Sequence, residues 1–313
     1  MEGNNTMQAI SDSDIVEILN SITNNTLETT PNNEHTSTIE LRGEDAVING
    51  IHELDGAGIE EAGEEGLLKA LPTNPITADE YIARYSNAPW LEIAKSDIIT
   101  IAGIGGIGSH TTFLLSRTGG NHLRLYDSDI IESHNLSGQL FSKDLVGTHK
   151  VYAMTNFIRK FSNTYNYTAN ISNFTKDSPI DKIAICGFDN MESRKIFYKS
   201  WKKHKQQETP ESQKGCLFID GRLTADEFQI YCIVGNDTYN MKRYEEEFLF
   251  DSSEVENLPC SFKQTTYLAS MIGSFITNLY INHCMNRVDG SKEIPLPFIT
   301  KYDANSMFLK TEI

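Results

Sequence analysis

The stretch Asp97-IITIAGIGGIGSHTTFLLSRTGGNHLRLY-Asp127 indicates how this 313-residue chain folds. Its first part, residues 97–102, is apolar and β-branched, which is typical of a buried strand. The glycine-rich residues 103–108 follow, and residues 109–118 have the composition of a helix that ends at Gly119-Gly120. Residues 122–126 then predict a second strand. Together these elements predict one strand–helix–strand unit with a parallel pair of strands.

The rest of the chain continues this alternation. We expect helices over residues 81–94, 146–161, 191–204 and 265–284, and strands over 167–172, 182–186, 217–220, 228–234, 298–302 and 307–310. The acidic residues 237–259 are expected to form a long irregular crossing loop. Alternating strands and helices predict an α/β fold with a Rossmann-like, doubly wound, mostly parallel sheet.

Charge divides the chain into two regions. Residues 1–80 contain 17 acidic and 2 basic residues, whereas the remainder contains 26 acidic and 25 basic residues. We therefore predict an acidic, low-complexity and disordered extension over residues 1–75, with a short helix at residues 11–20, followed by the folded domain at 76–313. Residues 46–71 are compatible with a solvated linker or with an arm that docks on the domain or a partner. Thr77 and Glu80 have the spacing of a capping box at the domain's first helix.

Composition excludes several classes of protein. The sequence contains no run of about eighteen apolar residues, so we expect no membrane span. Residues 1–10 lack the pattern of a secretory signal. The five cysteines are scattered and form no C-x-x-C pair, so we expect reduced thiols, a cytoplasmic location and no structural zinc. A nearly neutral domain also lacks the clustered basic face that nucleic acids require.

The glycine-rich turn predicts a nucleotide site. Gly103, Gly105, Gly106 and Gly108 lie between a strand and a helix, where backbone amides can approach phosphate oxygens. Asp127 ends the second strand, nineteen residues after Gly108, at the position from which a carboxylate accepts hydrogen bonds from ribose hydroxyls. These features alone suit ATP and NAD equally.

Three further motifs resemble those of the ThiF, MoeB and E1-like activating enzymes. Residues 127–139, DSDIIESHNLSGQ, are similar to D-x-D-x-[VI]-x-x-x-N-L-x-R-Q. Residues 146–150, VGTHK, resemble V-G-x-x-K, and Asp189-Asn190 with Arg194 resembles D-N-x-x-x-R. The motifs occur in the family's order over roughly residues 81–284.

The resemblance implies an adenylyltransferase that uses ATP and Mg²⁺. It implies that Asp127 holds the ribose, that Lys150 neutralises triphosphate charge, and that Asp189 binds Mg²⁺. It further implies that Cys260 accepts an acyl group. It assigns the remaining polar contacts with the nucleotide to Asp129, Asn135, Gln139, Asn190 and Arg194. The expected substrate is the C-terminal glycine of a ubiquitin-like or sulfur-carrier protein, and the expected assembly is a homodimer.

Each of these assignments has a simpler alternative. Lys150 is compatible with a solvated helix lysine, and Asp189 with the N-cap of the helix that follows. Asp129 is compatible with a residue that orders its turn. Cys260 is compatible with a small buried apolar residue.

The chain departs from the family motifs at two positions. Gly138 stands where N-L-x-R-Q has arginine, and Asn87 stands at the second arginine of the family's R-Y-x-R-Q. Arg84, Lys143 and Arg194 are the candidates to compensate. Three hypotheses follow: an adenylating enzyme, a catalytically weak nucleotide-binding interaction module, and an NAD-dependent oxidoreductase that leaves Lys150 and Asp189 unexplained.

Overall fold

The computed structural model describes residues 38–41, 78–118, 122–162, 166–250 and 264–313. All of them belong to one compact unit, Ser37–Ile313. The expected helix at residues 11–20, the arm at 46–71 and the glycine pair at 119–120 lie outside the described residues. Within the predicted extension the structure describes one strand, β1.

The strands form a single sheet in the order β1-β4-β3-β2-β5-β6-β7-β8-β9. The strands are β1 (Thr38–Leu41), β2 (Ile98–Ala102), β3 (His122–Tyr126), β4 (Tyr167–Asn170), β5 (Ile183–Cys186), β6 (Leu217–Leu223), β7 (Glu227–Val234), β8 (Ile299–Asp303) and β9 (Phe308–Glu312). The five strands β4-β3-β2-β5-β6 pair in parallel, and β1, β7, β8 and β9 add antiparallel strands at the two edges. The predicted Rossmann-like α/β fold is confirmed.

The chain reverses its direction of winding at β2. It runs outward from β2 through β3 to β4, and it then returns to place β5 and β6 on the other side of β2. In open parallel sheets, ligands bind in the crevice at the carboxyl ends of the two strands that flank such a reversal. The ends of β2 and β5 therefore mark the expected site.

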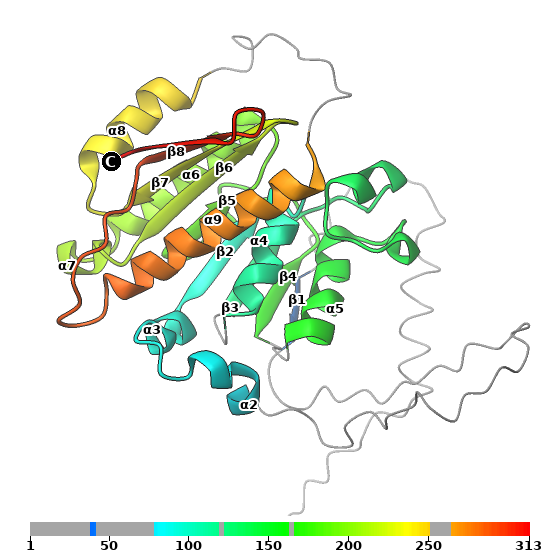
Figure 1. Cartoon of the computed structure of the whole chain (residues 1–313), viewed down its shortest axis with the longest axis horizontal. Helices are drawn as coiled ribbons and strands as arrows, with labels where there is room; N and C mark the ends of the chain where they lie inside the picture. The colour runs from blue at the N-terminus through cyan, green and yellow to red at the C-terminus, as the bar shows by residue number, and fades with distance from the viewer. Residues whose placement is uncertain (1–37, 42–77, 119–121, 163–165, 251–263) are drawn as a thin grey trace, which may run out of the picture. The chain divides into compact units, whose positions relative to one another are not determined.

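The helices cover both faces of the sheet (Figure 1). They are α2 (Ala78–Ile82), η1 (Ala83–Tyr85), α3 (Leu91–Ser96), α4 (Gly106–Ser116), η2 (Ser133–Ser137), η3 (Lys143–Leu145), α5 (Lys150–Ser162), α6 (Met191–Gln206), α7 (Pro210–Gln213), α8 (Thr238–Arg243), the π-helical turn η4 (Tyr244–Phe248) and α9 (Thr266–Met285). In Figure 1 the long helix α9 crosses in front of the sheet beside α4, and α6 lies behind the strands. Alternate strand residues consequently pack into two separate cores.

The two cores follow the period-two alternation of buried strands. Ile183 and Ile185 belong to the core that α4, α5 and α9 cover, whereas Ala184 and Cys186 face the core that α6 and α8 cover. The second core is rich in aromatic side chains, including Trp201 and Phe218. Burial on both faces explains why these strands read as continuous apolar runs.

Several element boundaries differ from the sequence expectation. Helix α4 begins at Gly106, because the last glycines of the turn form its first turn. The helix-like residues 81–94 are split into short helices around Pro89, which cannot donate the hydrogen bond that a continuous helix needs. The expected crossing loop at 237–259 begins instead with α8, which Asp237 caps, and continues as η4.

Helix α5 begins at Lys150 and not at Val146 as predicted. Gly147 has φ of 92°, a conformation that favours glycine and breaks the helix there. The Gly147 amide donates to the Ile131 carbonyl, and Ile130 bridges His149 in antiparallel fashion. These pairings hold residues 147–149 against residues 130–131, and α5 begins directly after them.

A buried histidine gives the fold an expected sensitivity to acid. His283, on α9, is 2% exposed, and burial lowers the pKa of its imidazole to about 4 from an ordinary value of 6.5. Between these two values the unfolded chain binds a proton that the folded chain does not. The stability that the neutral imidazole contributes is therefore present above pH 6.5 and is lost as the pH falls toward 4.

We expect this residue to account for about 3 kcal/mol of stability loss over that interval. The measurement is urea unfolding at pH 7 and pH 4.5 for the wild type and for His283→Gln, with the exposed His134→Gln as the control. The difference in stability between the two pH values is expected to shrink in His283→Gln only. An equal difference in all three proteins would refute the assignment.

Candidate functional site

The carboxyl ends of β2 and β5 touch through two glycines. Gly103 has φ of 84°, and a Cβ atom placed on it would lie 2.7 Å from the Gly187 carbonyl carbon. A Cβ on Gly187 would lie 2.6 Å from the Gly103 oxygen. Only glycine fits at either position, so the turn after β2 runs directly against residues 187–189 after β5.

The glycine-rich turn leads into the first turn of α4. A Cβ on Gly108 would lie 1.9 Å from the Gly103 oxygen, so this glycine permits the helix to pack on its own turn. Gly105 differs, because a Cβ there would meet a single atom within 4 Å, Nε2 of Gln139 at 3.8 Å. The first amides of a helix lack partners within the helix and attract anions. The open space over Gly105 therefore suits a phosphate group.

Asp127 joins the end of β3 to the glycine-rich turn. Its Oδ2 accepts a hydrogen bond from the Ile104 amide at 2.7 Å, and its Oδ1 accepts one from the Asp129 amide at 2.8 Å. Burial raises the pKa of this carboxyl group, whereas the nearby Lys150 charge acts in the opposite direction. Each oxygen still has capacity for a second donor, as a ribose hydroxyl would provide.

Lys150 lies beside the same aspartates. Its side chain is 8% exposed, and its Nζ lies 2.8 Å from Oδ2 of Asp129, whose own side chain is 65% exposed. The Lys150 amide also donates to the Asp129 carbonyl at 2.9 Å. Lys150 is thus not the solvated helix lysine of the simpler alternative. Asp129 both closes the turn after β3 and pairs with this buried cation.

The polar residues in η2 and just after it have distinct surroundings. Asn135 completes a capping box, since its Oδ1 accepts from the Glu132 amide at 2.9 Å. Gln139 is 8% exposed, and its Oε1 has no hydrogen-bond partner among the described residues. A buried amide oxygen without a partner is costly, and because a phosphate over Gly105 only accepts hydrogen bonds, Gln139 would contact it through its NH₂ group. The amide can rotate to present its NH₂ group instead.

Asp189 and Asn190 follow the Gly187 contact. Asn190, and not Asp189, is the N-cap of α6, because its Oδ1 accepts from the Ser193 amide at 2.9 Å. The Asp189 side chain is exposed and accepts from Asn190 Nδ2 at 3.3 Å. Among the described residues no group of three His, Cys, Asp or Glu side chains is placed to hold a metal ion. One carboxylate with substrate phosphates is nevertheless a common Mg²⁺ ligand set, so Asp189 fits that role.

Arg194 lies inside the second core. Its guanidinium donates to Oδ1 of Asp220, to the Gly221 carbonyl at 3.0 Å and to the Phe188 carbonyl. Asp220 is fully buried and also accepts from Arg222 and Tyr244. Arg194 is thereby fixed between α6 and β6, and its predicted contact with nucleotide stays a prediction.

The remaining candidate cations lie elsewhere on the surface. Lys143, in η3, is exposed, as is Arg84 in η1. Both α2 and η1 pack on the end of α4, since Arg117 lies over the Tyr81 ring at 5.2 Å and the Tyr85 hydroxyl donates to the Arg117 carbonyl. Asn87 is exposed just after this segment. Cys260, the predicted acceptor thiol, lies outside the described residues.

The structure brings one further residue to the site that sequence reasoning missed. Gln264 precedes α9, yet a Cβ on Gly106 would lie 2.1 Å from its Oε1, and a Cβ on Gly138 would lie 2.9 Å from its Cγ. No motif of the sequence singled it out. Its separation from Gly106 and Gly138 by more than a hundred residues hid the contact.

A model of the ThiF family matches residues 82–312, which include every described element of the site. The chain belongs to the ThiF family. Among curated proteins, it is 28% identical over 168 residues to ubiquitin-like modifier-activating enzyme 5 of Xenopus laevis, covering 48% of this chain and 41% of that protein. The Aedes aegypti protein of the same name is 28% identical over 156 residues, covering 44% and 39%. The chain therefore spans about 40% of the length of these relatives.

Three solved structures illustrate the similarity of the fold. A crystal structure of E. coli MccB with MccA-N7isoASN has a TM-score of 0.58 at 17% identity and covers 75% of this chain and 72% of its own. A structure of PaaA has a TM-score of 0.57 at 16% identity, covering 76% and 75%. A structure of E. coli MccB with ATP has a TM-score of 0.52 at 16% identity, covering 75% and 68%.

Proposed function

We propose that this ThiF-family protein adenylates a carboxylate with ATP and Mg²⁺. A carboxylate oxygen attacks the α-phosphorus, the bond between the α-phosphorus and the bridging oxygen breaks, and pyrophosphate leaves with that oxygen. The demand on the protein is to position the reactants and to neutralise charge, because no proton has to move. The substrate in this proposal is the C-terminal glycine of a ubiquitin-like or sulfur-carrier protein.

One observation carries the proposal: a buried lysine stands beside the ribose-type aspartate. The charge of Lys150 acts on the Asp127 carboxyl group, and its Nζ contacts Asp129 at 2.8 Å. A cation at this position suits a triphosphate. An NAD-dependent oxidoreductase would use the glycine-rich turn and Asp127, but it would not explain a buried cation at Lys150. The ATP-bound MccB structure and the relatives named as activating enzymes support the same conclusion.

We assign roles to the remaining residues from their positions in the crevice. Asp189 would hold Mg²⁺, because its exposed carboxylate follows the glycine that touches the turn after β2. Gly103, Gly105, Gly106 and Gly108 would carry the phosphates, and Gln139 would supply a polar contact. Asn135 and Asn190 would act mainly by fixing the turns on which the neighbouring residues lie. Cys260, which lies outside the described residues, is assigned by the family resemblance: its thiol would attack the acyl adenylate to form a thioester, releasing AMP and the thiol proton.

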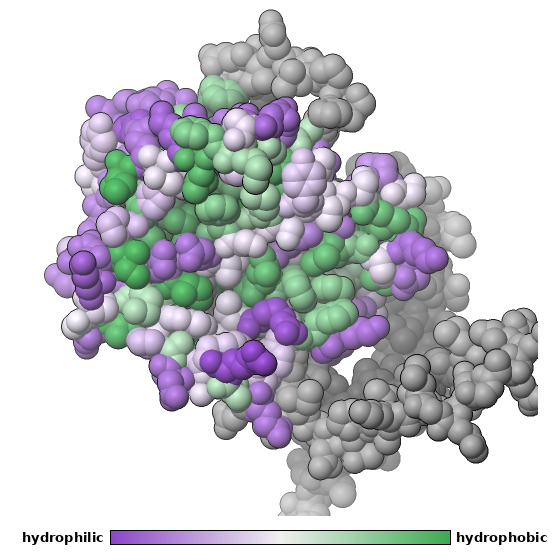
Figure 2. Space-filling model, in the orientation of Figure 1, coloured by the Kyte–Doolittle hydropathy of each residue, from purple (hydrophilic) through white to green (hydrophobic). Residues whose placement is uncertain are grey.

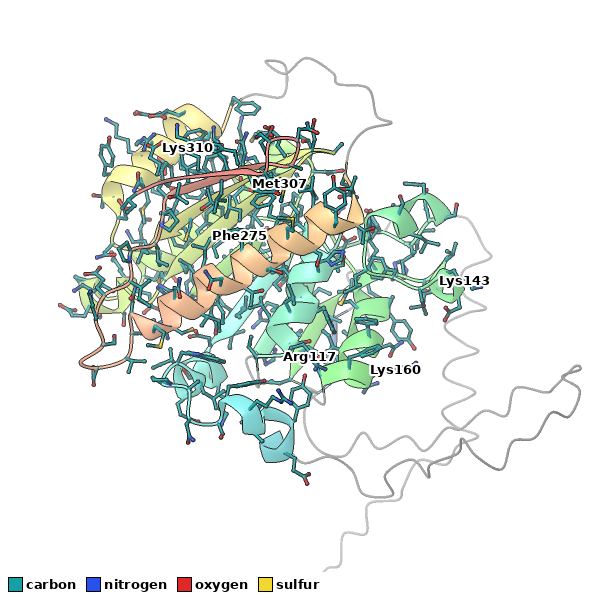
Figure 3. All side chains as sticks on the ribbon, viewed as in Figure 1. Arg117, Lys143, Lys160, Phe275, Met307 and Lys310 are labelled. Atoms are coloured by element: carbon teal, nitrogen blue, oxygen red, sulfur yellow. The ribbon has the colours of Figure 1, made fainter. Side chains whose placement is uncertain are left out.

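A protein partner is also part of the proposal. Large apolar side chains are exposed at the edge strand β9 and its turn, with Met307 78% and Phe308 62% exposed. Figure 2 shows apolar residues spread over the face that α9 crosses, and Figure 3 shows Met307 and Phe275 on that face. Apolar surface of this kind suits protein contacts, which the carrier protein and a second copy of the chain would both make.

A second candidate function is a nucleotide-binding interaction module with weak catalysis. Gly138 and Asn87 stand in place of family arginines, and the guanidinium of Arg194 is held by Asp220 in the core. Loss of a preorganised cation lowers rates by about a hundredfold or more. This candidate keeps ATP binding and loses the transfer step.

No helix of the described residues is long and apolar enough to cross a membrane.

The first test is calorimetric titration with ATP·Mg²⁺ and, separately, with NAD. We expect the wild type to bind ATP, with an affinity that falls at least tenfold when Mg²⁺ is withheld. Asp189→Ala is expected to remove this dependence on Mg²⁺, while the exposed Asp177→Ala retains it. Preference for NAD, with equal behaviour of the wild type and Asp189→Ala, would contradict the proposal.

A further inference from the structure

We propose that Gln264 contacts the nucleotide phosphates in place of the cation that position 138 lacks. This inference rests on the proposed function and assigns a further residue to the same site. Gln264 lies outside the family motifs of the sequence. Its assignment comes from the space that its side chain occupies.

The Gln264 carboxamide lies between two glycines of the crevice. A Cβ on Gly106 would lie 2.1 Å from Oε1 and 2.8 Å from Cδ of Gln264. A Cβ on Gly138 would lie 2.9 Å from its Cγ and 3.1 Å from its Nε2. Real Cβ atoms essentially never come within 3.0 Å of another atom, so a side chain at either position would push the flexible Gln264 amide aside, and the two glycines leave it in this place.

The same contacts explain what replaces the arginine. Any side chain at position 138 would displace Gln264 from the start of α4. In this chain the lack of a side chain at Gly138 is thus what leaves room for the Gln264 carboxamide beside Gly106. A charged guanidinium is exchanged for a neutral group that can still donate a hydrogen bond.

Two features that do not involve Gln264 suit a ligand in this neighbourhood. Gln139 is 8% exposed, and its Oε1 has no partner among the described residues. A Cβ on Gly105 would meet a single atom within 4 Å, Nε2 of Gln139 at 3.8 Å, so the space over this glycine is open apart from the Gln139 amide. Two carboxamides thus flank the first turn of α4, whose amides favour an anion.

The backbone before α9 holds Gln264 in this place. Thr266 Oγ1 donates to the Ser137 carbonyl, which fixes the start of α9 on η2. Thr265 is the N-cap residue of α9. The amide therefore reaches the crevice from the residue just before the N-cap of α9, a helix start that Thr266 ties to η2.

The arrangement predicts selectivity among nucleotides. Gln264 is expected to contribute more to ATP affinity than to AMP affinity, because it lies at the helix start, where ATP places three phosphates and AMP one. A hydrogen bond to a charged phosphate corresponds to about a tenfold change in affinity.

The test measures ATP and AMP binding by calorimetry, with Mg²⁺ present, for the wild type, Gln264→Ala and Gly138→Ala. Each variant is expected to bind ATP about tenfold more weakly, since the new methyl group of Gly138→Ala displaces the amide. The double variant should be no weaker than either single variant, because both changes remove one contact. Gln206→Ala, an exposed glutamine at the end of α6, is the matched control.

The outcomes separate this inference from the proposed function. Unchanged ATP affinity in a folded Gln264→Ala protein would overturn the role of Gln264 and leave the proposed function standing. Tighter ATP binding would also overturn it, since Gln264 would then block the site. Additive losses in the double variant would show that Gly138 acts independently of Gln264. If the wild type binds no ATP, both proposals fail.

Discussion

Lys150→Met is expected to weaken ATP·Mg²⁺ binding by about 10- to 100-fold and to leave AMP binding within about threefold of the wild type. The Lys150 charge is held beside Asp127 and Asp129 in a nearly buried position. There it attracts phosphate oxygens more strongly than a solvated cation would. Methionine retains the length of the apolar stem, so the packing at the start of α5 is preserved.

The measurement is titration calorimetry with ATP and AMP, each with Mg²⁺. Lys160→Met provides the control, because Lys160 is exposed near the other end of α5 (Figure 3). A thermal unfolding curve checks that both variants fold. Equal losses for ATP and AMP would indicate that Lys150 supports the site only through Asp129, and that the triphosphate role is wrong.

Asp220→Ala is expected to lower the free energy of unfolding by about 3–5 kcal/mol. The fully buried Asp220 accepts hydrogen bonds from Arg194, Arg222 and Tyr244. Its removal leaves two guanidinium groups, 7% and 17% exposed, without their carboxylate. Breaking a buried ion pair costs far more than removing an exposed charge.

Urea unfolding followed by circular dichroism measures this loss. The exposed Asp177→Ala is the reference variant, and we expect it to change stability by less than about 0.5 kcal/mol. Asp220→Asn keeps the shape of the side chain and should lose less than Asp220→Ala. A loss below about 1 kcal/mol for Asp220→Ala would show that the network contributes little to stability.

The assignment of Arg194 depends on the same network. The Arg194 guanidinium is held by Asp220 and two backbone carbonyls. A substitution of Arg194 is therefore expected to disturb the packing of α6 on β6, and to change nucleotide affinity only through that disturbance. The motif D-N-x-x-x-R thus contains three residues with three different tasks here: Asp189 is exposed at the crevice, Asn190 caps α6, and Arg194 ties α6 to the sheet.

The sequence by itself determined the parts of the protein that depend on local pattern. Residues 97–127 predicted the strand, turn, helix and strand because burial on both faces requires apolar runs and the tight turn requires glycine. The motif residues predicted the neighbourhood of Asp127 and Lys150. They also led to the family, since three motifs in a fixed order are far more specific than one glycine pattern.

Only the tertiary structure decided which side chains meet and which are buried. Nothing local distinguishes Lys150 from a solvated helix lysine; the pairing of residues 130–131 with 147–149 places it against Asp129. Gln264 reaches Gly106 and Gly138 across more than a hundred residues of chain because α9 packs on η2 and α4. Such contacts depend on how distant elements pack, and no periodicity or spacing within a segment encodes that packing.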